Sequence, residues 1–297
     1  MTTPTPVLRP RYQVPPPPVV PAKRFSLLSA AQVVDEGGTL WQEGVEYYSD
    51  ACNLETGFVD GWCPPVPVDE HGNELEKAIE SFSPVKVTAD PFTITSGIAC
   101  QSPVFAAIDQ ARRLLERGED LQVERQFWRQ QMCRTDVHLV GKDKVLGLDD
   151  LIALIESHAA AHYAGQLFIH VPVRALVYLK QYRTSDQYGP LWRTGYGSVI
   201  VPGAGYVGLG GPNTAGPGEP CKPEPPPGDD DPWFWVLATG QVQIRRSDTF
   251  AHEAFDTKKN RRGAIAERTY VISADCYAAA GKADPCGCTP TSSGGSS

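Results

Sequence analysis

Hydrophobic residues recur at helical spacing from Ser102 to about Trp128, and this stretch is the strongest secondary-structure signal in the chain. Ser102 suits the N-cap, Pro103 suits the first helical position, and charged residues lie opposite the apolar stripe. At ~1.5 Å per residue, such a helix is ~35–40 Å long. The pattern therefore predicts a long spine helix over residues 102–128.

A second helical pattern runs from about Leu148 to Tyr163, with two aspartates near its N-terminus, where the helix dipole favours negative charge. The apolar run 167–171 predicts a short buried strand, and Pro172 predicts a third helix that ends near Lys180. The succession of helix, strand and helix indicates a compact α/β module.

Strands are predicted where apolar residues alternate or form short runs. These segments are 91–100, 198–201, 233–238, 241–245 and 265–276. Residues 203–231 interrupt this series with a stretch rich in Gly and Pro, which predicts a loop insertion.

The two ends of the chain differ in composition from its middle. Residues 1–24 are rich in proline and predict an extended arm, since ~20 residues in polyproline geometry reach ~60 Å. Residues 25–101 predict an extended loop and strand region, with a short helix over 74–82. Residues 278–297 predict a flexible C-terminal tail.

Composition and charge exclude a few classes of protein. Of 297 residues, 41% are hydrophobic and 21% are charged, a balance typical of globular proteins. No run approaches the ~18 apolar residues of a membrane-spanning helix, and no export signal is visible. The formal net charge of -8 argues against a protein that binds nucleic acid through phosphate contacts.

Eight cysteines among 297 residues are too dilute for a small domain that is held together by disulfide bonds. We expect a protein assembled in the cytoplasm with mostly buried thiols. The sequence leaves open that Cys52 pairs with Cys63, or Cys286 with Cys288, after release into an oxidising medium.

Residues 203–208 match the dinucleotide-binding pattern GxGxxG and follow a predicted strand. A phosphate site of this kind requires a helix to begin directly afterwards, so that its N-terminus faces the pyrophosphate. Residues 209–212 read Leu-Gly-Gly-Pro and are a poor helix start. We therefore interpret the match as part of the loop.

Other chemistry-bearing residues have plainer interpretations. His158 and His162 lack the glutamate of a zinc-protease motif, so we expect them to pack. Cys286 and Cys288, with Cys276 nearby, fall short of four zinc ligands, so we expect exposed thiols. A solvated or intersubunit ionic face is predicted from these helix residues: Glu119, Asp120, Glu124, Arg117, Arg125 and Arg129. No catalytic, cofactor-binding or metal-binding residue is predicted, and we expect no enzyme.

The order of elements resembles the Johnson fold of tailed-bacteriophage major capsid proteins and encapsulin shell proteins, of the actinobacterial-phage type. The residues that carry the resemblance are 111–128, 166–172 followed by 175–179, 191–201, 243–247 and 267–271. It implies an α+β fold with an N-terminal arm, an extended loop, a long spine helix, a peripheral domain (102–147 and 236–277) and an apical domain (148–235). Residues 25–67 and 203–231 are not standard parts of that fold.

The resemblance implies a virion structural protein, a major capsid subunit that forms hexamers and pentamers of an icosahedral head around double-stranded DNA. It implies assembly in the host cytoplasm, no cofactor, no membrane, and scaffold, portal or decoration proteins as further partners. An encapsulin-type nanocompartment shell and a minor capsid, decoration or tail protein remain open. The expected intersubunit contacts are Trp41, Tyr47, Tyr48, Phe58, Trp62, Arg117, Glu119 and Arg125.

Overall fold

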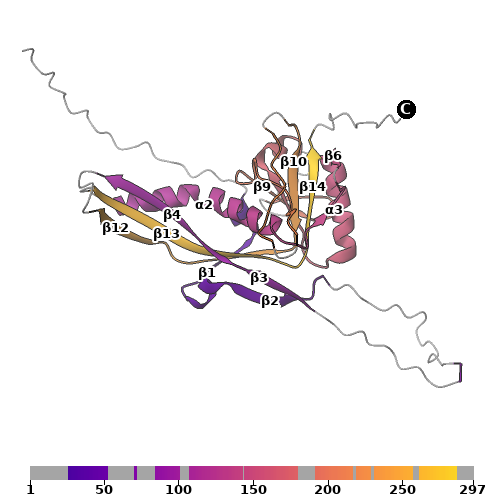
Figure 1. Ribbon diagram of the computed structural model, residues 1–297, viewed down its shortest axis with the longest axis horizontal. Helices are drawn as coiled ribbons and strands as arrows, with labels where there is room; N and C mark the ends of the chain where they lie inside the picture. The colour runs from indigo at the N-terminus through magenta and orange to yellow at the C-terminus, as the bar shows by residue number, and fades with distance from the viewer. Residues whose placement is uncertain are drawn as a thin grey trace, which may run out of the picture.

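The subunit is elongated, with a long β-platform at one side and a compact lobe at the other (Figure 1). This computed structural model describes residues 26–52, 70–71, 84–100, 107–142, 144–179, 191–216, 219–228, 231–256 and 261–285. Two larger sheets, a two-stranded ribbon and a few helices make up the fold. The mixture of sheets and few helices confirms the coarse fold prediction.

The platform is a five-stranded sheet built along one long strand, β13 (Arg261–Ala274). Strand β4 (Pro91–Cys100) pairs antiparallel with one edge of β13. Strands β12 (Phe250–Asp256) and β11 (Val242–Arg246) follow one another along the other edge, and β1 (Gln32–Asp35) pairs parallel with β11. At ~3.3 Å per residue, β13 is ~46 Å long, so the platform is a narrow ribbon.

Helix α2 (Ala107–Met132) covers one face of the platform (Figure 1). Ala111 and Leu115 of the helix share a core with one face of β13, through Ala264, Ala266, Tyr270, Ile272 and Ala274. The predicted spine helix is confirmed in its body. It continues to Met132 because Phe127, Trp128 and Met132 are buried in the same core, while residues 102–106 lie outside the described ranges.

The lobe is a seven-stranded sheet in the order β5-β14-β10-β7-β9-β8, with β6 also paired to β14. Helix α3 (Leu148–His162) covers one face and the C-terminal half of α2 lies on the other. Along β10, Phe234 and Val236 join the α3 core, whereas Trp235 and Leu237 join the α2 core. The strand bounds are β5 His138–Leu139, β6 Val145–Gly147, β7 Phe168–Pro172, β8 Trp192–Arg193, β9 Val199–Gly203, β10 Phe234–Thr239 and β14 Ala278–Asp284.

The region predicted as a loop before the spine helix contains short regular elements. Helix α1 (Leu27–Ala30) packs on α2, and β1 follows it. The 3-10 turn η1 (Leu40–Glu43) leads into β2 (Val45–Ser49), which pairs antiparallel with β3 (Val85–Ala89). The ribbon of β2 and β3 lies beneath the platform in Figure 1. The predicted helix over 74–82 lies outside the described residues.

Three sequence predictions need correction. The helix expected from Pro172 to Lys180 is only a 3-10 turn, η2 (Val173–Val177). The tail expected from residue 278 begins instead with β14, a buried inner strand. The predicted domain limits also differ from the sheets, because the lobe sheet takes strands from residue 138 onwards and includes β10 and β14.

Strand β14 escaped prediction because it consists largely of alanine and glycine, which give little strand signal. The small residues are required by packing. A Cβ at Gly281 would lie 2.4 Å from Leu151 of α3. The close approach of helix and strand therefore explains the composition.

The described part of loop 203–231 forms no helix and no named strand beyond the end of β9, as predicted. It is nevertheless anchored: Trp128 donates its indole N–H to the carbonyl of Gly210 at 2.9 Å, and Asn213 N–H donates to the carbonyl of Met132 at 2.8 Å. In the part of the chain that the structure describes, no helix is long and apolar enough to cross a membrane.

Candidate functional surfaces

The aromatic residues predicted to make contacts divide between interior and surface. Trp41, in the 3-10 turn η1, is buried, with 6% of its surface exposed. In β2, Tyr47 is half-buried, and burial followed by the charge of Asp275 raises its pKa to about 12. Tyr48, on the opposite face of the strand, is 64% exposed. Phe58 and Trp62 lie outside the described residues, so Tyr48 is the one predicted aromatic contact shown at the surface.

Glu119 does not lie on an ionic surface, which corrects the sequence prediction. Its Oε1 atom accepts hydrogen bonds from Arg268 Nη1 at 2.9 Å, Arg246 Nη1 at 3.3 Å and the hydroxyl of Tyr270 at 2.6 Å. Burial and the bond to Glu119 raise the pKa of Tyr270. Glu119 therefore joins α2 to the platform inside one subunit, while Arg117 is exposed and Arg125 is half-buried.

Glu124 is also buried, again contrary to the predicted ionic face. Its carboxylate accepts the backbone N–H groups of Leu27 at 3.3 Å and Gly205 at 2.8 Å. Burial is the main reason that its pKa is raised, to about 7. Asp120 likewise turns inward, accepting a hydrogen bond from Ser26 Oγ at 3.1 Å. Asp120 and Glu124 thus bind the segment around Ser26 and Leu27, and Glu124 also binds the Gly-rich loop at Gly205.

The GxGxxG pattern at 203–208 is explained by this packing. A Cβ at Gly205 would lie 2.5 Å from the Cβ of Glu124 and 2.7 Å from the carbonyl oxygen of Leu121. No helix follows the pattern within the described residues. Gly205 therefore permits a close approach to α2, whereas Gly208 has open space around it and adopts a positive φ of 68°. The segment is a loop, as predicted.

His158 and His162 pack, as predicted, in a stack that also contains His138. Ring centroids are 3.7 Å apart for His138 and His158 and 4.2 Å apart for His158 and His162. Nδ1 of His158 lies 3.0 Å from the hydroxyl of Tyr277. Burial and the neighbouring His138 and His162 lower the pKa of His158. Among the described residues, no His, Cys, Asp and Glu side chains are grouped to hold a metal ion.

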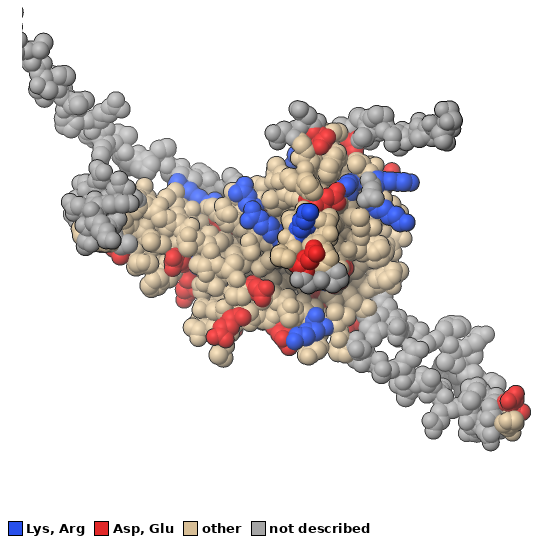
Figure 2. Space-filling view, in the orientation of Figure 1, with Lys and Arg blue, Asp and Glu red and all other residues tan. Residues whose placement is uncertain are grey.

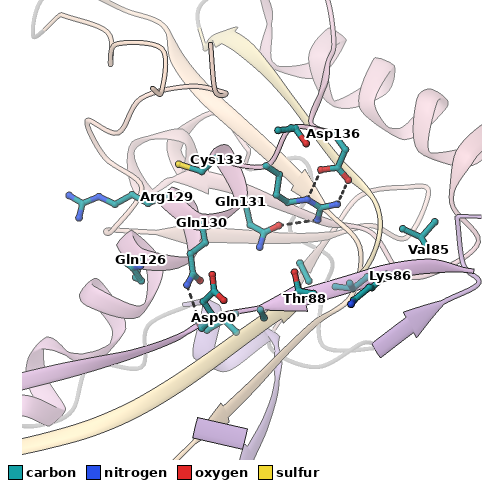
Figure 3. A pocket seen from close by; sticks show the side chains of 16 residues that line it. Val85, Lys86, Thr88, Asp90, Gln126, Arg129, Gln130, Gln131, Cys133 and Asp136 are labelled. Atoms are coloured by element: carbon teal, nitrogen blue, oxygen red, sulfur yellow. Dashed lines mark hydrogen bonds and ion pairs between the residues drawn. The ribbon is translucent and has the colours of Figure 1, made fainter. Parts of the chain in front are cut away.

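A groove of about 760 Å³ lies between β3 and the C-terminal end of α2 (Figure 3). Gln130 reaches across it and donates to the carbonyl of Asp90 at 3.3 Å. The Oε1 atom of Gln130 is buried and has no hydrogen-bond partner in the described structure. At the other end, Arg134 pairs with Asp136 at 2.6 Å. Amide, carboxylate and guanidinium groups of β3 and α2 therefore line this groove.

Exposed apolar side chains occur on several separate parts of the subunit. On the outer strand β12, Phe250 is 64% exposed and Phe255 is 61% exposed. Neither residue was predicted as a contact, because residues 250–256 read Phe-Ala-His-Glu-Ala-Phe-Asp and lack the apolar–polar alternation of a half-buried strand. Further exposed apolar residues are Leu40, Leu154, Val173, Val177, Tyr178, Tyr196 and Val207.

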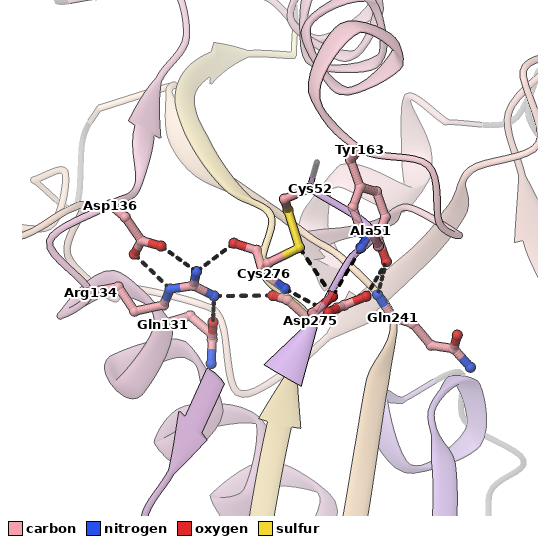
Figure 4. The surroundings of a disulfide bond; sticks show 10 residues. Ala51, Cys52, Gln131, Arg134, Asp136, Tyr163, Gln241, Asp275 and Cys276 are labelled. Carbon is pink, nitrogen blue, oxygen red and sulfur yellow. Dashed lines mark hydrogen bonds and ion pairs between the residues drawn. A yellow bond between two sulfur atoms is a disulfide. The ribbon is translucent and has the colours of Figure 1, made fainter. Parts of the chain in front are cut away.

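Within the described residues, two disulfide bridges pair four of the cysteines that were expected to be thiols. Cys52 pairs with Cys276, and Cys133 pairs with Cys221. The alternative pairing of Cys52 with Cys63 is therefore wrong, and Cys276 is not free to bind metal. Figure 4 shows the first bridge beside the crossing from platform to lobe. The expected exposed thiols of Cys286 and Cys288 lie outside the described residues.

No protein-family model and no curated protein matches the chain. It aligns with the head structure of Helicobacter pylori bacteriophage KHP40 at 9% identity, over 92% of this chain and 95% of that chain, with a TM-score of 0.49. The capsid of a native GTA particle aligns at 10% identity over 90% and 99%, with a TM-score of 0.49. Mycobacterium phage Bobi aligns at 13% identity over 90% and 93%, with a TM-score of 0.46.

Proposed function

We propose that the chain is a major capsid subunit, a non-enzymatic structural protein that self-assembles into an icosahedral head enclosing double-stranded DNA. The observation that carries the proposal is the platform, a narrow β-ribbon whose outer strands offer free edges and exposed aromatic side chains. The structures with which the chain aligns are likewise capsids and phage heads.

The free edges belong to three different strands. Among the described residues, β4 pairs only with β13, β12 only with β13, and β1 only with β11. Unpaired strand edges are templates for contact with other chains, and proteins usually cover them. Here exposed Phe250 and Phe255 lie on one such edge strand, and aromatic side chains are frequent anchors of protein interfaces.

Several separate contact surfaces suit a shell better than a simple dimer. A two-fold dimer needs one self-complementary patch, whereas a closed shell repeats heterologous contacts between different faces. Exposed apolar residues on the platform edge, η1, β2 and the lobe supply such distinct faces. Figure 2 shows acidic and basic side chains scattered over the subunit, with the visible Lys and Arg mostly around the lobe.

Within this proposal the elements take the roles of a Johnson fold. The platform and α2 form the peripheral domain with its spine, and the seven-stranded lobe is the apical domain. The β2–β3 ribbon is the base of the extended loop, and residues 1–24 are the arm. Copies of the chain are the principal partners, in hexamers and pentamers, with scaffold, portal or decoration proteins as further ones.

The enclosed DNA is held without sequence-specific recognition, in line with the net charge of -8. We place the mature protein in the virion and its assembly in the host cytoplasm.

The double variant Phe250→Asp, Phe255→Asp tests this proposal. Both side chains are more than half exposed, so the isolated subunit should fold with little loss of stability. We expect particle formation to be lost, measured by sedimentation velocity and electron microscopy. Leu114→Asp, at an exposed position of α2, is the matched control and should assemble. Normal particles from the double variant would contradict the proposed role of this edge.

A further inference from the structure

Each of these disulfide bridges joins two segments that lie in different secondary-structure regions of the subunit. Cys133 directly follows α2, whereas Cys221 lies in the loop between β9 and β10 of the lobe. Cys52 lies after β2, and Cys276 lies where the chain crosses from β13 of the platform to β14 of the lobe. The paired residues are 88 and 224 positions apart in sequence. Neither bridge is a local clip within a hairpin.

The two bridges differ in their access to solvent. Cys221 is exposed, and Cys133 is half-buried at the margin of the groove between β3 and α2 (Figure 3). Cys276 is only 6% exposed, and its partner Cys52 is half-buried. A thiolate must reach a sulfur atom to exchange with it, so access controls the rate of exchange. The Cys133–Cys221 bridge is therefore the one presented to small thiols.

The backbone around the less accessible bridge is held on both sides (Figure 4). Arg134 Nη2 donates to the carbonyl of Cys276 at 2.7 Å, and the N–H of Cys276 donates to Asp275 Oδ1 at 2.8 Å. On the other side, Ala164 N–H donates to the carbonyl of Ala51 at 2.8 Å. These hydrogen bonds fix the backbone on both sides of the bridge, so its half-buried and buried cysteines gain little access to solvent from local backbone movement.

The loop that carries Cys221 has a firm base and a less constrained tip. At the base, Asn213 N–H bonds to the carbonyl of Met132, and Lys282 pairs with Glu224 at 2.6 Å. In the tip, Thr214 N–H donates to the carbonyl of Lys222, and Lys222 N–H donates to Asn213 Oδ1. These tip bonds lie within the loop itself. Without its disulfide, the tip would lose its covalent tie to α2 while the base stays in place.

We propose that Cys133–Cys221 is a redox-responsive bridge, opened and closed by exchange with small-molecule thiols and disulfides, and that Cys52–Cys276 is a permanent structural bridge. In opening, a thiolate attacks one sulfur to give a mixed disulfide and one protein thiolate. A second thiolate displaces the other protein sulfur, so two thiols RSH become RSSR as the bridge becomes two cysteine thiols. Closing is the reverse, with RSSR as oxidant. The proposal concerns the single subunit and does not depend on its assembly.

Alkylation mapping in glutathione redox buffers tests the difference between the bridges. The purified full-length chain is mixed with reduced and oxidised glutathione, and samples taken over time are quenched with iodoacetamide and analysed by peptide mass spectrometry. We expect Cys133 and Cys221 to be alkylated at least about tenfold faster than Cys52 and Cys276 in the folded protein. In denaturant the difference should vanish. Equal rates in the folded protein, faster opening of Cys52–Cys276, or resistance of both bridges would overturn the proposal.

Hydrogen exchange tests the local nature of the change. On reduction, amides of residues 214–216 and 219–222 should exchange faster, while those of β7 and β10 stay protected. The double variant Cys133→Ser, Cys221→Ser should reproduce this pattern and no longer respond to thiol. If reduction instead exposes β7 and β10, the bridge maintains the whole lobe and is no local switch.

Discussion

Glu119 joins the spine helix to two strands of the platform. One of its oxygens accepts bonds from two arginines of different strands and from the hydroxyl of Tyr270. The side chain of Arg268 is 18% exposed, so losing the carboxylate leaves its positive charge poorly hydrated, whereas Arg246 keeps its ion pair with Asp35. Glu119 is a structural centre within the subunit.

Replacing Glu119 by alanine should therefore lower the free energy of unfolding by about 3 kcal/mol. Urea unfolding followed by circular dichroism measures it. Glu116→Ala, an exposed neighbour on the same helix, is the control and should change stability by less than ~0.5 kcal/mol. Equal effects of the two substitutions would show that the buried network contributes little.

His170 makes stability depend on pH. It is fully buried in β7, where Nδ1 lies 3.2 Å from the hydroxyl of Tyr206 and Nε2 lies 3.0 Å from Thr239 Oγ1. Because the Thr239 hydroxyl donates to the carbonyl of Gly240, Nε2–H is assigned as donor to Thr239. Burial lowers the pKa of His170 from 6.5 to about 3.

A lowered histidine pKa means that the unfolded chain binds the proton more readily than the folded one. The stability that neutral His170 contributes is complete above about pH 6.5 and is lost as pH falls towards 3, at ~1.4 kcal/mol per pH unit. His170→Asn should remove this slope in urea unfolding between about pH 6.5 and pH 4. His71→Asn, with a side chain 75% exposed, should keep it. An unchanged slope in His170→Asn would contradict the assignment.

The sequence pattern predicted the histidines of α3 correctly, but not the acidic residues of α2. The stack of His158 and His162 follows from helical spacing alone. The acids were misassigned because that spacing reveals only neighbours on the same helix. Glu119 bonds to Arg246 and Arg268, which are 127 and 149 positions away, and such partners are not visible in a local pattern.

At the scale of elements, α2 determines how platform and lobe meet. Its first half packs on β4 and β13, while Phe127 and Trp128 in its second half share a core with the lobe residues Val201 and Trp235. Apolar periodicity predicted the body of this helix, since the pattern is long and its buried face is continuous. Strand β14 was missed because it consists largely of alanine and glycine, which give little strand signal, and Gly281 is required by the close approach of Leu151 in α3.

Adjacent leucines of α2 offer a direct test of its buried face. Leu115 is 2% exposed against the platform, whereas Leu114 is 40% exposed. Leu115→Asp should lower the free energy of unfolding by about 4 kcal/mol or more, because a charge is buried without a partner. Leu114→Asp should lower it by less than ~1 kcal/mol, since the new charge stays hydrated. Similar melting temperatures for the two variants would show that the helix faces the other way.

At the scale of the whole molecule, an elongated platform, a compact lobe and two long-range disulfides form one subunit with several exposed contact surfaces. The resemblance in the order of elements implied a peripheral and an apical domain, but its domain limits differ from the two sheets, because the lobe sheet takes strands from both sides of those limits. The resemblance gave no disulfide partners, because pairing cannot be read from cysteine spacing alone. The firm attachment of loop 203–231 was not predicted either. Its anchors are the indole of Trp128, the contact of Gly205 with α2 and the Cys133–Cys221 bridge, and they join residues far apart in the sequence.

Electron microscopy of the purified full-length chain, with sedimentation velocity on the same sample, tests self-assembly most directly. We predict closed shells of uniform size, built from clusters of six and five subunits. A chain that remains a folded monomer at every concentration would contradict the account.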